Sequence, residues 1–352
     1  MTAVTTVAEV PPPDWDARTV DAPGGHLLQG AAWAEQCRGW GWRPRFVGFD
    51  DGRAALLLVS RTPPLPGYVA YCPRGPITAG DQPAAAAARA VALAAWARAD
   101  GAMVLAVDPE IDADPSFETA LAAGGFRGVE EIQPSRHRLV LDLPAGTAED
   151  ALLGGMSRST RQRIAAAQAG GIAVREDAAG EHLEAFGALL DATARRRHFD
   201  FAAQRGFVTW WRRILVTGQG RFLVAEASGR LLGGLIVYLQ GGHWATAFSA
   251  DDAALRRDHP GTMHLLRWTA IRMALAAGAP SIDLGGVDLA GARERPEPGD
   301  ANWGLYEHKA GFGARWVQSA GAHEIVLRPA LYRTQGMLRA MRRRARRLVV
   351  RA

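Results

Sequence analysis

Lysine and cysteine are the two residues that this sequence most nearly lacks. Of its 41 lysines and arginines only Lys309 is a lysine, and Cys37 and Cys72 are its two cysteines. Two cysteines cannot form a disulfide framework or a zinc-binding set, so they do not indicate secretion. The start, MTAVTTVAEVPPPDWD, has no basic segment followed by an apolar stretch, and no run of about 18 apolar residues predicts a membrane-spanning helix. We therefore expect a soluble cytoplasmic protein.

The common motifs of nucleophilic, metal and nucleotide chemistry are also missing. The sequence contains no G-x-S-x-G, no H-E-x-x-H, no Walker loop and no G-x-G-x-x-G after a strand. Its nine histidines are scattered, so we expect His259 and His264 in turns or in packing rather than on a metal. The prediction is a site with no cofactor and no metal. Such a site works by positioning two substrates and stabilising charge.

The composition that remains is that of a globular enzyme with a basic surface. The 352 residues are 48% hydrophobic and 22% charged, enough apolar material for the cores of two domains. A formal charge of +5 and a pI near 9.7 favour an anionic partner such as nucleic acid, a phosphorylated substrate or an anionic membrane. The alternative is a mildly basic surface that only aids solubility.

Helices and strands alternate twice along the chain in a similar order. The elements predicted for the first half are a helix within 26–42, two strands joined by Asp50-Asp51-Gly52, a helix at 83–99, a strand in AMVLAVDPE, a helix at 116–124 and a strand at 137–143. Those predicted for the second half are helices at 157–171, 181–195 and 261–277, one beginning near Val208, and strands at 221–227, 231–240, 243–249 and 281–286. This repetition predicts an α/β (α+β) fold of two comparable units.

The C-terminal stretch is strongly basic. It carries eight arginines from Arg333 onward. The pattern predicts a cationic helix that touches a phosphate backbone or the anionic inner face of a membrane. A solvated, frayed tail is the alternative interpretation.

Lys309 lies in LYEHKAGFGARW, just before two glycines that predict a tight turn. Gly311 and Gly313 allow backbone conformations that other residues rarely adopt. An ammonium is a compact point charge, whereas a guanidinium is a flat fork. The compact charge better matches an oxyanion developing on a tetrahedral carbon. The alternative is an ordinary surface lysine.

A series of segments in a fixed order carries a family resemblance. They are LLQGAAWAEQ, VDP at 107–109, QPSRHRLVLDL, MSRSTRQRIAAAQAGGIAV, TARRRHF, AFSAD, HPGTMHLLRWTAIRMALAAG, SIDLGGVD and GLYEHKAGFGARW. Together they resemble the Fem family, peptidoglycan bridge-forming aminoacyltransferases that use aminoacyl-tRNA as donor. The resemblance implies two GNAT-like acyltransferase domains in tandem, of the compact type without a helical arm. Residues 1–145, completed by 316–352, would form the first, and residues 146–315 would form the second.

The resemblance also implies roles for individual residues. Lys309 matches the lysine that stabilises the tetrahedral intermediate. Asp108 matches an acidic residue beside the acceptor amine, where a carboxylate can accept a proton, and a simple Asp-Pro turn is the alternative. His308 replaces a phenylalanine expected to stack on the terminal adenosine of the tRNA, and imidazole can also stack on an unpaired base. Asp283 in SIDLGGVD and Ser249 in AFSAD are expected to bind substrate.

Two further positions concern the phosphates of the acceptor. Arg196 in TARRRHF matches an arginine expected at these phosphates, with a solvated helix charge as the alternative. Cys37 stands where many members have a phosphate-binding lysine. Arg38 or Arg45 is expected to substitute for that lysine, and the alternative is an acceptor that is not a UDP-muropeptide.

The resulting prediction is an enzyme that moves an amino acid from aminoacyl-tRNA to the amine of a UDP- or lipid-linked muropeptide in cell-wall cross-bridge formation. One alternative keeps the fold but uses acyl-CoA or an acyl carrier protein, although the Arg/Gln-x-x-Gly-x-Gly/Ala loop of GNAT domains is missing. A second alternative is tRNA-dependent transfer to a secondary-metabolite peptide. A third is a non-enzymatic membrane- or RNA-binding protein that relies on its arginine tail.

Overall fold

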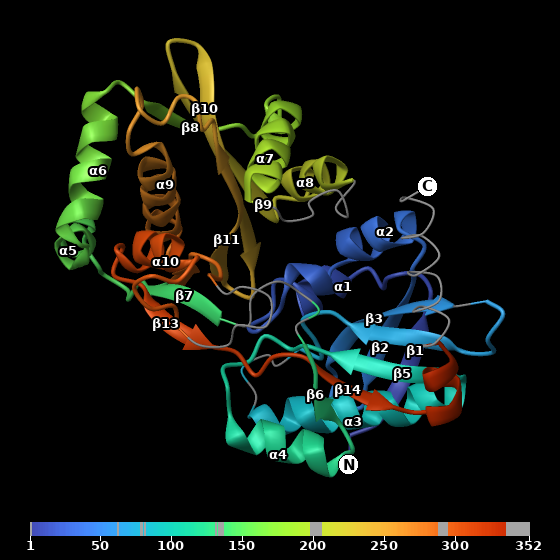
Figure 1. The fold of residues 1–352 in the computed structure, drawn as a ribbon. Coiled ribbons are helices and arrows are strands. Elements are labelled where there is room, and N and C mark those ends of the chain that lie inside the picture. Colours follow the sequence, from blue (N-terminus) through green and yellow to red (C-terminus); the bar gives the residue numbers. More distant parts are fainter. Residues whose placement is uncertain are drawn as a thin grey trace. The chain divides into compact units, whose positions relative to one another are not determined.

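Two compact units make up the chain. The computed structural model describes residues 2–61, 63–77, 80, 82–130, 132, 137–197, 206–287 and 295–335 (Figure 1). Unit 1 is Met1–Gln133 with Ala320–Ala352, and unit 2 is Pro134–Ser319. Each unit contains one seven-stranded sheet with helices, as expected for a repeated α/β arrangement.

Unit 1 is built on a mixed sheet in the order β1-β2-β3-β4-β5-β14-β6. Its strands are β1 (Val4–Ala8), β2 (Arg43–Phe49), β3 (Ala54–Arg61), β4 (Tyr68–Cys72), β5 (Ala102–Val107), β6 (Arg127–Gly128) and β14 (His323–Val326). Its helices are α1 (Trp15–Thr19), the 3-10 turn η1 (Leu27–Gln29), α2 (Ala31–Gly39), α3 (Pro83–Asp100) and α4 (Pro115–Ala123). Among the described strands of unit 1, only β4 and β5 pair in parallel, because α3 forms the crossover between them.

The crossover helix α3 packs through alanine. Ala86, Ala90 and Ala97 are fully buried in the core that also contains strand residues of the sheet. Small side chains at helical spacing let the helix approach the sheet closely. The helix ends at Gly101, whose φ of 103° is the left-handed C-terminal conformation that glycine favours. The predicted helix 83–99 and the strand after it are confirmed.

Unit 2 has a sheet in the order β13-β7-β12-β11-β10-β9-β8. Its strands are β7 (His137–Asp142), β8 (Ala173–Glu176), β9 (Gly220–Ala227), β10 (Arg230–Gln240), β11 (His243–Asp251), β12 (Ser281–Asp283) and β13 (Arg315–Gln318). Its helices are α5 (Glu149–Gly155), α6 (Arg158–Ala169), α7 (Leu183–Arg197), α8 (Phe207–Val216), α9 (Thr262–Ala276) and α10 (Trp303–Ala310). Helix α9 packs on β9 to β12, and α6 packs on α9 (Figure 1).

The units differ from the expected domains at two strands. The strand predicted at 137–143 forms as β7, but it pairs with β12 and β13 in the sheet of unit 2. Strand β13 therefore also belongs to unit 2, although the expected first domain included residues from 316 onward. The reason is strand pairing, because β7 hydrogen-bonds to β12 along one edge and to β13 along the other. Strand β14 pairs with β5, so the chain does return to the sheet of unit 1 after residue 320.

Two features near the C-terminus bear on the predicted site. Helix α10 was not predicted, and it places Lys309 in its last turn rather than on an irregular segment. Residues 336–352 lie outside the described residues, and most of the predicted cationic helix falls there. Within the part of the chain that the structure describes, no helix combines the length and apolar character needed to cross a membrane.

Candidate active site

The glycine turn after Lys309 rests on the start of α6. Ser157 caps α6, and its side chain accepts a hydrogen bond from the Thr160 amide. The Ser157 amide donates to the Gly311 carbonyl oxygen at 2.8 Å. A Cβ on Gly311 would lie 2.4 Å from Thr160 Oγ1. Gly311 is therefore needed for close approach, while Gly313 supplies a positive φ of 84°.

Replacing Gly311 with alanine is expected to destabilise the protein by about 1–3 kcal/mol, because the added methyl overlaps Thr160. Gly304, within α10, is the control, since nothing lies within 4 Å of its added Cβ. Gly304→Ala should raise stability by up to about 1 kcal/mol. Denaturant unfolding of both variants tests this, and equal shifts in the same direction would contradict the steric explanation.

The Lys309 ammonium lies against the loop that follows β12. The side chain is only 6% exposed, and Nζ donates to the Gly286 carbonyl oxygen at 2.7 Å. Gly285 has a φ of 82°, and a Cβ there would lie 3.0 Å from Nζ. The buried Asp283 carboxylate accepts from the Gly285 amide at 2.6 Å and so shapes this loop. In this structure Asp283, expected to bind substrate, supports the backbone that holds the lysine.

His308 joins a hydrogen-bonded chain with α9. Its Nε2 lies 2.9 Å from a terminal nitrogen of Arg267, and its Nδ1 lies 3.0 Å from Nε2 of His264. The rings of His264 and His308 meet edge to face at 4.2 Å. Arg267 also donates to Ser249 Oγ at 3.1 Å. The structure thus connects Ser249 to His308 through Arg267, a contact that local sequence did not reveal.

Burial and positive neighbours depress the basicity of this cluster. Burial is the main cause that lowers the pKa of His308 far below its ordinary value, followed by Arg267, His264, Lys309 and Arg163. Burial, then Arg163 and Arg267, lower the pKa of His264 to about 4. Burial lowers the pKa of Arg267 to about 10, so its guanidinium stays charged at neutral pH. Two neutral imidazoles therefore lie among buried or adjacent cations.

Asp108 of unit 1 is a buried carboxylate at the end of β5. It is 3% exposed and accepts from the Tyr71 hydroxyl at 2.7 Å and from the Arg74 amide at 2.6 Å. Arg74 holds a positive φ of 50°, which is uncommon for a residue with a side chain. Burial raises the pKa of Asp108 to about 6, against the lowering effects of Arg74 and Tyr71. A carboxyl with this pKa can exchange protons near neutral pH.

The arginines of unit 1 that are expected to bind phosphate differ in exposure, since Arg38 is exposed and Arg45 is half-buried. Arg38 on α2 pairs with Glu35 at 2.9 Å and donates to the Glu9 carbonyl oxygen at 2.6 Å. Arg45 pairs with the carboxylate of the same Glu9 at 2.8 Å. Cys37 is instead buried in the core, and burial raises the pKa of its thiol to about 12. Of these neighbours, only the arginines can meet a phosphate from solvent.

Arg196 lies exposed near the end of α7. Among the described residues, no hydrogen bond or ion pair of the Lys309 cluster involves it. In unit 2 the structure therefore forms two hydrogen-bonded groups that meet at the adjacent residues His308 and Lys309, one including Ser249 and the other Asp283. Arg196 belongs to neither group.

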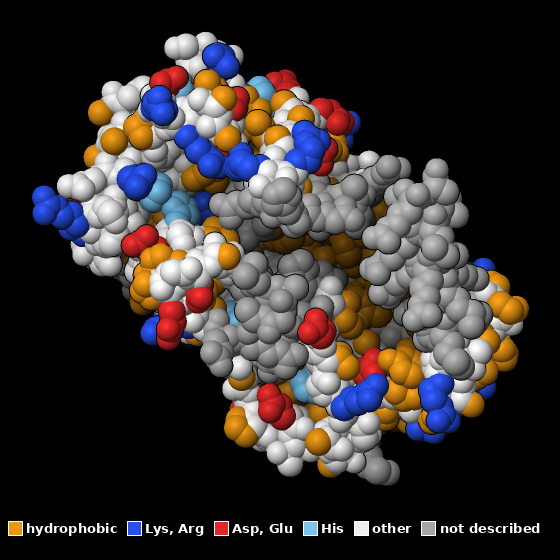
Figure 2. Space-filling model, viewed as in Figure 1, with side chains coloured by type: hydrophobic (Ala, Val, Ile, Leu, Met, Phe, Trp, Pro, Cys, Tyr) orange, Lys and Arg blue, Asp and Glu red, His pale blue; other side chains and the backbone are white. Residues whose placement is uncertain are grey.

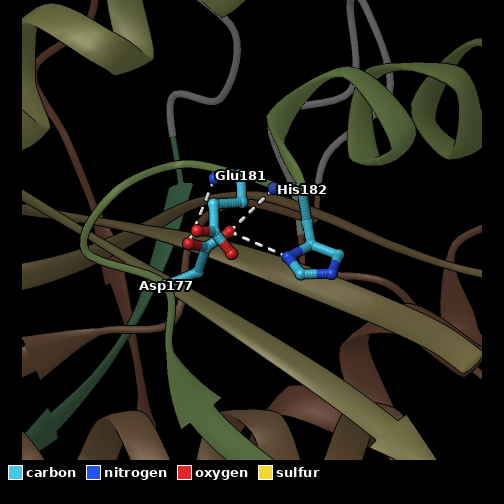
Figure 3. Close-up of side chains that lie close together, drawn as sticks. All are labelled: Asp177, Glu181 and His182. Atoms are coloured by element: carbon cyan, nitrogen blue, oxygen red, sulfur yellow. Dashed lines mark hydrogen bonds and ion pairs between the residues drawn. The ribbon is translucent and has the colours of Figure 1, made fainter. Parts of the chain in front are cut away.

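A group of possible metal ligands in unit 2 has a structural explanation. Asp177, Glu181 and His182 lie close together just before α7, as Figure 3 shows. The Asp177 carboxylate accepts from the amides of Glu181 and His182 and lies 3.1 Å from Nδ1 of His182. These are the contacts of a helix-capping carboxylate, which satisfies the otherwise unpaired first amides of a helix. The expectation of a site without metal is not tested by this cluster.

Sequence reasoning missed Arg267 and the role of His264. The signal was present, because the two residues are three positions apart on the predicted helix 261–277 and so share a face. An arginine within the apolar run LLRWTAI also indicates a buried cation that needs hydrogen-bond partners.

Comparisons with known proteins agree with this architecture. An Acetyltransferase (GNAT) domain model matches residues 156–310, and the FemAB family model matches residues 14–117. The crystal structure of FemX superposes with a TM-score of 0.76 at 20% identity, over 94% of this chain and 99% of that one. The structure of L-PGS from Bacillus licheniformis superposes with a TM-score of 0.51 at 12% identity, over 84% of this chain and 88% of that one. The predicted fold, two GNAT-like units in tandem, is confirmed.

A curated relative is similar in sequence to about half of this chain. Lipid II:glycine glycyltransferase of Staphylococcus aureus is 30% identical over 198 residues, which are 52% of this chain and 46% of that protein. The chain thus spans about half the length of the curated relatives it matches. The FemAB family model matches a segment of unit 1, the GNAT domain model matches a segment of unit 2, and the chain as a whole is thus similar to the Fem family.

Proposed function

We propose that this protein is an aminoacyltransferase that moves an amino acid from aminoacyl-tRNA to an amine of a lipid- or UDP-linked peptidoglycan precursor. The observation that carries the proposal is the buried Lys309 ammonium, held by Gly286 beside a loop with little side-chain bulk. The similarity to lipid II:glycine glycyltransferase supports a lipid-linked acceptor. Cytoplasmic action, where aminoacyl-tRNA is available, is part of the proposal.

In the proposed reaction the acceptor amine attacks the carbonyl carbon of the aminoacyl ester. A carbon–nitrogen bond forms, and the carbonyl oxygen becomes an oxyanion that the Lys309 ammonium stabilises. The ester carbon–oxygen bond then breaks, and the ribose hydroxyl leaves with a proton. The ester is already activated, so this step needs no ATP. Asp108, whose pKa is raised to about 6, is proposed to accept the proton that the amine releases.

Exposed arginines are proposed to bind the anionic parts of both substrates. On α6, Arg158, Arg161 and Arg163 are exposed, and they supply charge for the acceptor stem of the tRNA. Arginine side chains, interspersed with acidic ones, are also visible over the upper part of the face in Figure 2. Arg38 and Arg196 are proposed to contact acceptor phosphates. The arginines from Arg333 onward are proposed to touch the inner membrane surface where a lipid-linked acceptor resides.

A second candidate function is N-acyl transfer from acyl-CoA. The match of residues 156–310 to an acetyltransferase domain favours it. This function would use the same oxyanion stabilisation but a thioester donor. Replacing the donor in one assay therefore separates the two candidates.

The test incubates the full chain with radiolabelled aminoacyl-tRNA pools and with lipid- or UDP-linked muropeptides. We expect label in the peptide, and a loss of about tenfold or more in donor affinity between 50 and 200 mM salt as counterions are released. A parallel incubation replaces the tRNA with labelled acetyl-CoA. Label from acetyl-CoA alone would establish the second candidate, and transfer from tRNA with no salt dependence would contradict the role of the arginines.

A further inference from the structure

Arg267 dictates the direction of hydrogen bonding through His308. A guanidinium has N–H donors and no acceptor. Nε2 of His308, 2.9 Å from Arg267, must therefore accept, which leaves the single ring proton of a neutral imidazole on Nδ1. That proton donates to Nε2 of His264 at 3.0 Å. The chain consequently runs from Arg267 through His308 to His264 in one direction.

The charges around His308 oppose its protonation. Arg267 and His264 face it from α9, Lys309 follows it on α10, and Arg163 acts on it from α6. The carboxylate that acts on Arg267 is Asp251 of β11, which itself pairs with Arg256 at 2.6 Å. A protonated His308 would direct an N–H at the guanidinium and add a charge next to Lys309. Both effects keep the ring neutral.

Arg267 occupies this position at a cost in stability. The residue is 4% exposed, and its guanidinium hydrogen bonds within the described residues go to Ser249 and His308, both uncharged. Its Nε is buried and has no hydrogen-bond partner there. A buried cation with an unsatisfied donor is unfavourable, and such local costs are expected mainly at functional sites.

We propose that Arg267 is a positioning residue that fixes His308 as a neutral ring with unprotonated Nε2, so that this ring can stack on an uncharged purine of the donor beside Lys309. The inference rests on the proposed function for its ligand. It explains how histidine replaces the phenylalanine that the family resemblance leads one to expect. Both ring nitrogens are occupied within the protein, so the neutral ring has no N–H left to direct at the donor.

The first test is spectroscopic and needs no substrate. Nitrogen-15 NMR of histidine side chains in the full chain should show His308 with unprotonated Nε2 and protonated Nδ1, unchanged from pH 5.5 to 8. The loss of one signal in His308→Phe gives the assignment. In Arg267→Met, the ring should shift toward the Nε2–H form and its pKa should rise, because Nε2 no longer faces a guanidinium. Protonated Nε2 in the wild type would overturn the proposal without requiring any variant to fold.

Two further variants separate Arg267 from its neighbours. His264→Ala keeps the bond from Arg267, so His308 should retain unprotonated Nε2. Arg272→Met, on the same helix, removes an exposed arginine that pairs with Glu149 and should change nothing at His308. If His264→Ala releases the tautomer and Arg267→Met does not, Arg267 is not the positioning residue.

The second test measures transfer against pH. Burial still opposes protonation of His308 in Arg267→Met, so the effect is limited by that of a histidine of ordinary pKa, which is about nine-tenths protonated at pH 5.5. Relative to the wild type, the variant should therefore lose up to about tenfold more kcat/KM at pH 5.5 than at pH 8. In a His308→Phe background the same substitution should add no pH-dependent loss. An equal loss in both backgrounds would show that Arg267 does not act through His308. A protein without transfer activity but with the predicted tautomer would instead contradict the proposed function alone.

Discussion

Replacing Lys309 with methionine is expected to lower kcat for aminoacyl transfer by about 10²–10³-fold, the usual cost of removing one oxyanion donor. Methionine approximates the length of the lysine stem but has no ammonium. Because the proposed interaction forms with the oxyanion and not with the ground-state ester, KM for both substrates should change little. Single-turnover kinetics with labelled aminoacyl-tRNA would separate these two effects.

Two control variants test whether the effect depends on the position of the charge and on the shape of the charged group. Arg230→Met removes an exposed cation from β10 of the same unit and should leave kcat unchanged. Lys309→Arg keeps the charge but places a larger planar group where a Cβ on Gly285 would already lie 3.0 Å from Nζ, so it should not restore activity. Full activity of Lys309→Arg, or a raised KM with normal kcat in Lys309→Met, would rule out the proposed role.

Replacing Asp108 with asparagine is expected to lower kcat/KM by about 10²–10⁴-fold at neutral pH, the range typical of a lost general base. In the wild type, activity should fall below about pH 6 as Asp108 becomes protonated. The variant has no carboxyl to titrate, so its residual activity should lack this acidic limb. A pH profile of kcat/KM measures both features. Asp50→Asn, an exposed carboxylate of unit 1, is the control and should retain the wild-type profile.

The raised pKa of Asp108 has opposite consequences for activity and for stability, because activity needs the ionised carboxylate and the folded state favours the protonated form. Burial raises its pKa from 3.8 to about 6, so the folded state binds the proton more tightly than the unfolded state. The resulting stabilisation is complete below pH 3.8 and is lost as the pH rises through about 6. The full difference corresponds to roughly 3 kcal/mol. The Tm of Asp108→Asn relative to wild type should therefore increase from pH 4 to pH 8, and a constant difference would contradict the raised pKa.

Most helices and strands could be predicted because their signals are local. Ser157 is a sequence-encoded cap, Gly101 ends an alanine-rich helix, and the turn at Asp50-Asp51-Gly52 joins β2 to β3. Sheet membership could not be predicted in the same way. Strand β7 is followed in the sequence by the helices of unit 2, but its partners β12 and β13 lie more than a hundred residues away along the chain. The residue pattern of a strand predicts that the segment pairs with another strand, but it does not identify that partner.

The features of the candidate site can be separated in the same way into those predicted from the sequence and those seen only in the folded structure. The sequence by itself determined that the chain has one ammonium side chain, that a glycine turn follows it, and that the surrounding segments have a family order. Only the tertiary structure decided that Nζ is buried against Gly286 and that Arg267 meets His308. The physical reason is that burial and hydrogen bonding depend on groups brought together from α6, α9, α10 and β11. Residue identity fixes which charges are available, whereas folding decides which of them lose their water and face one another.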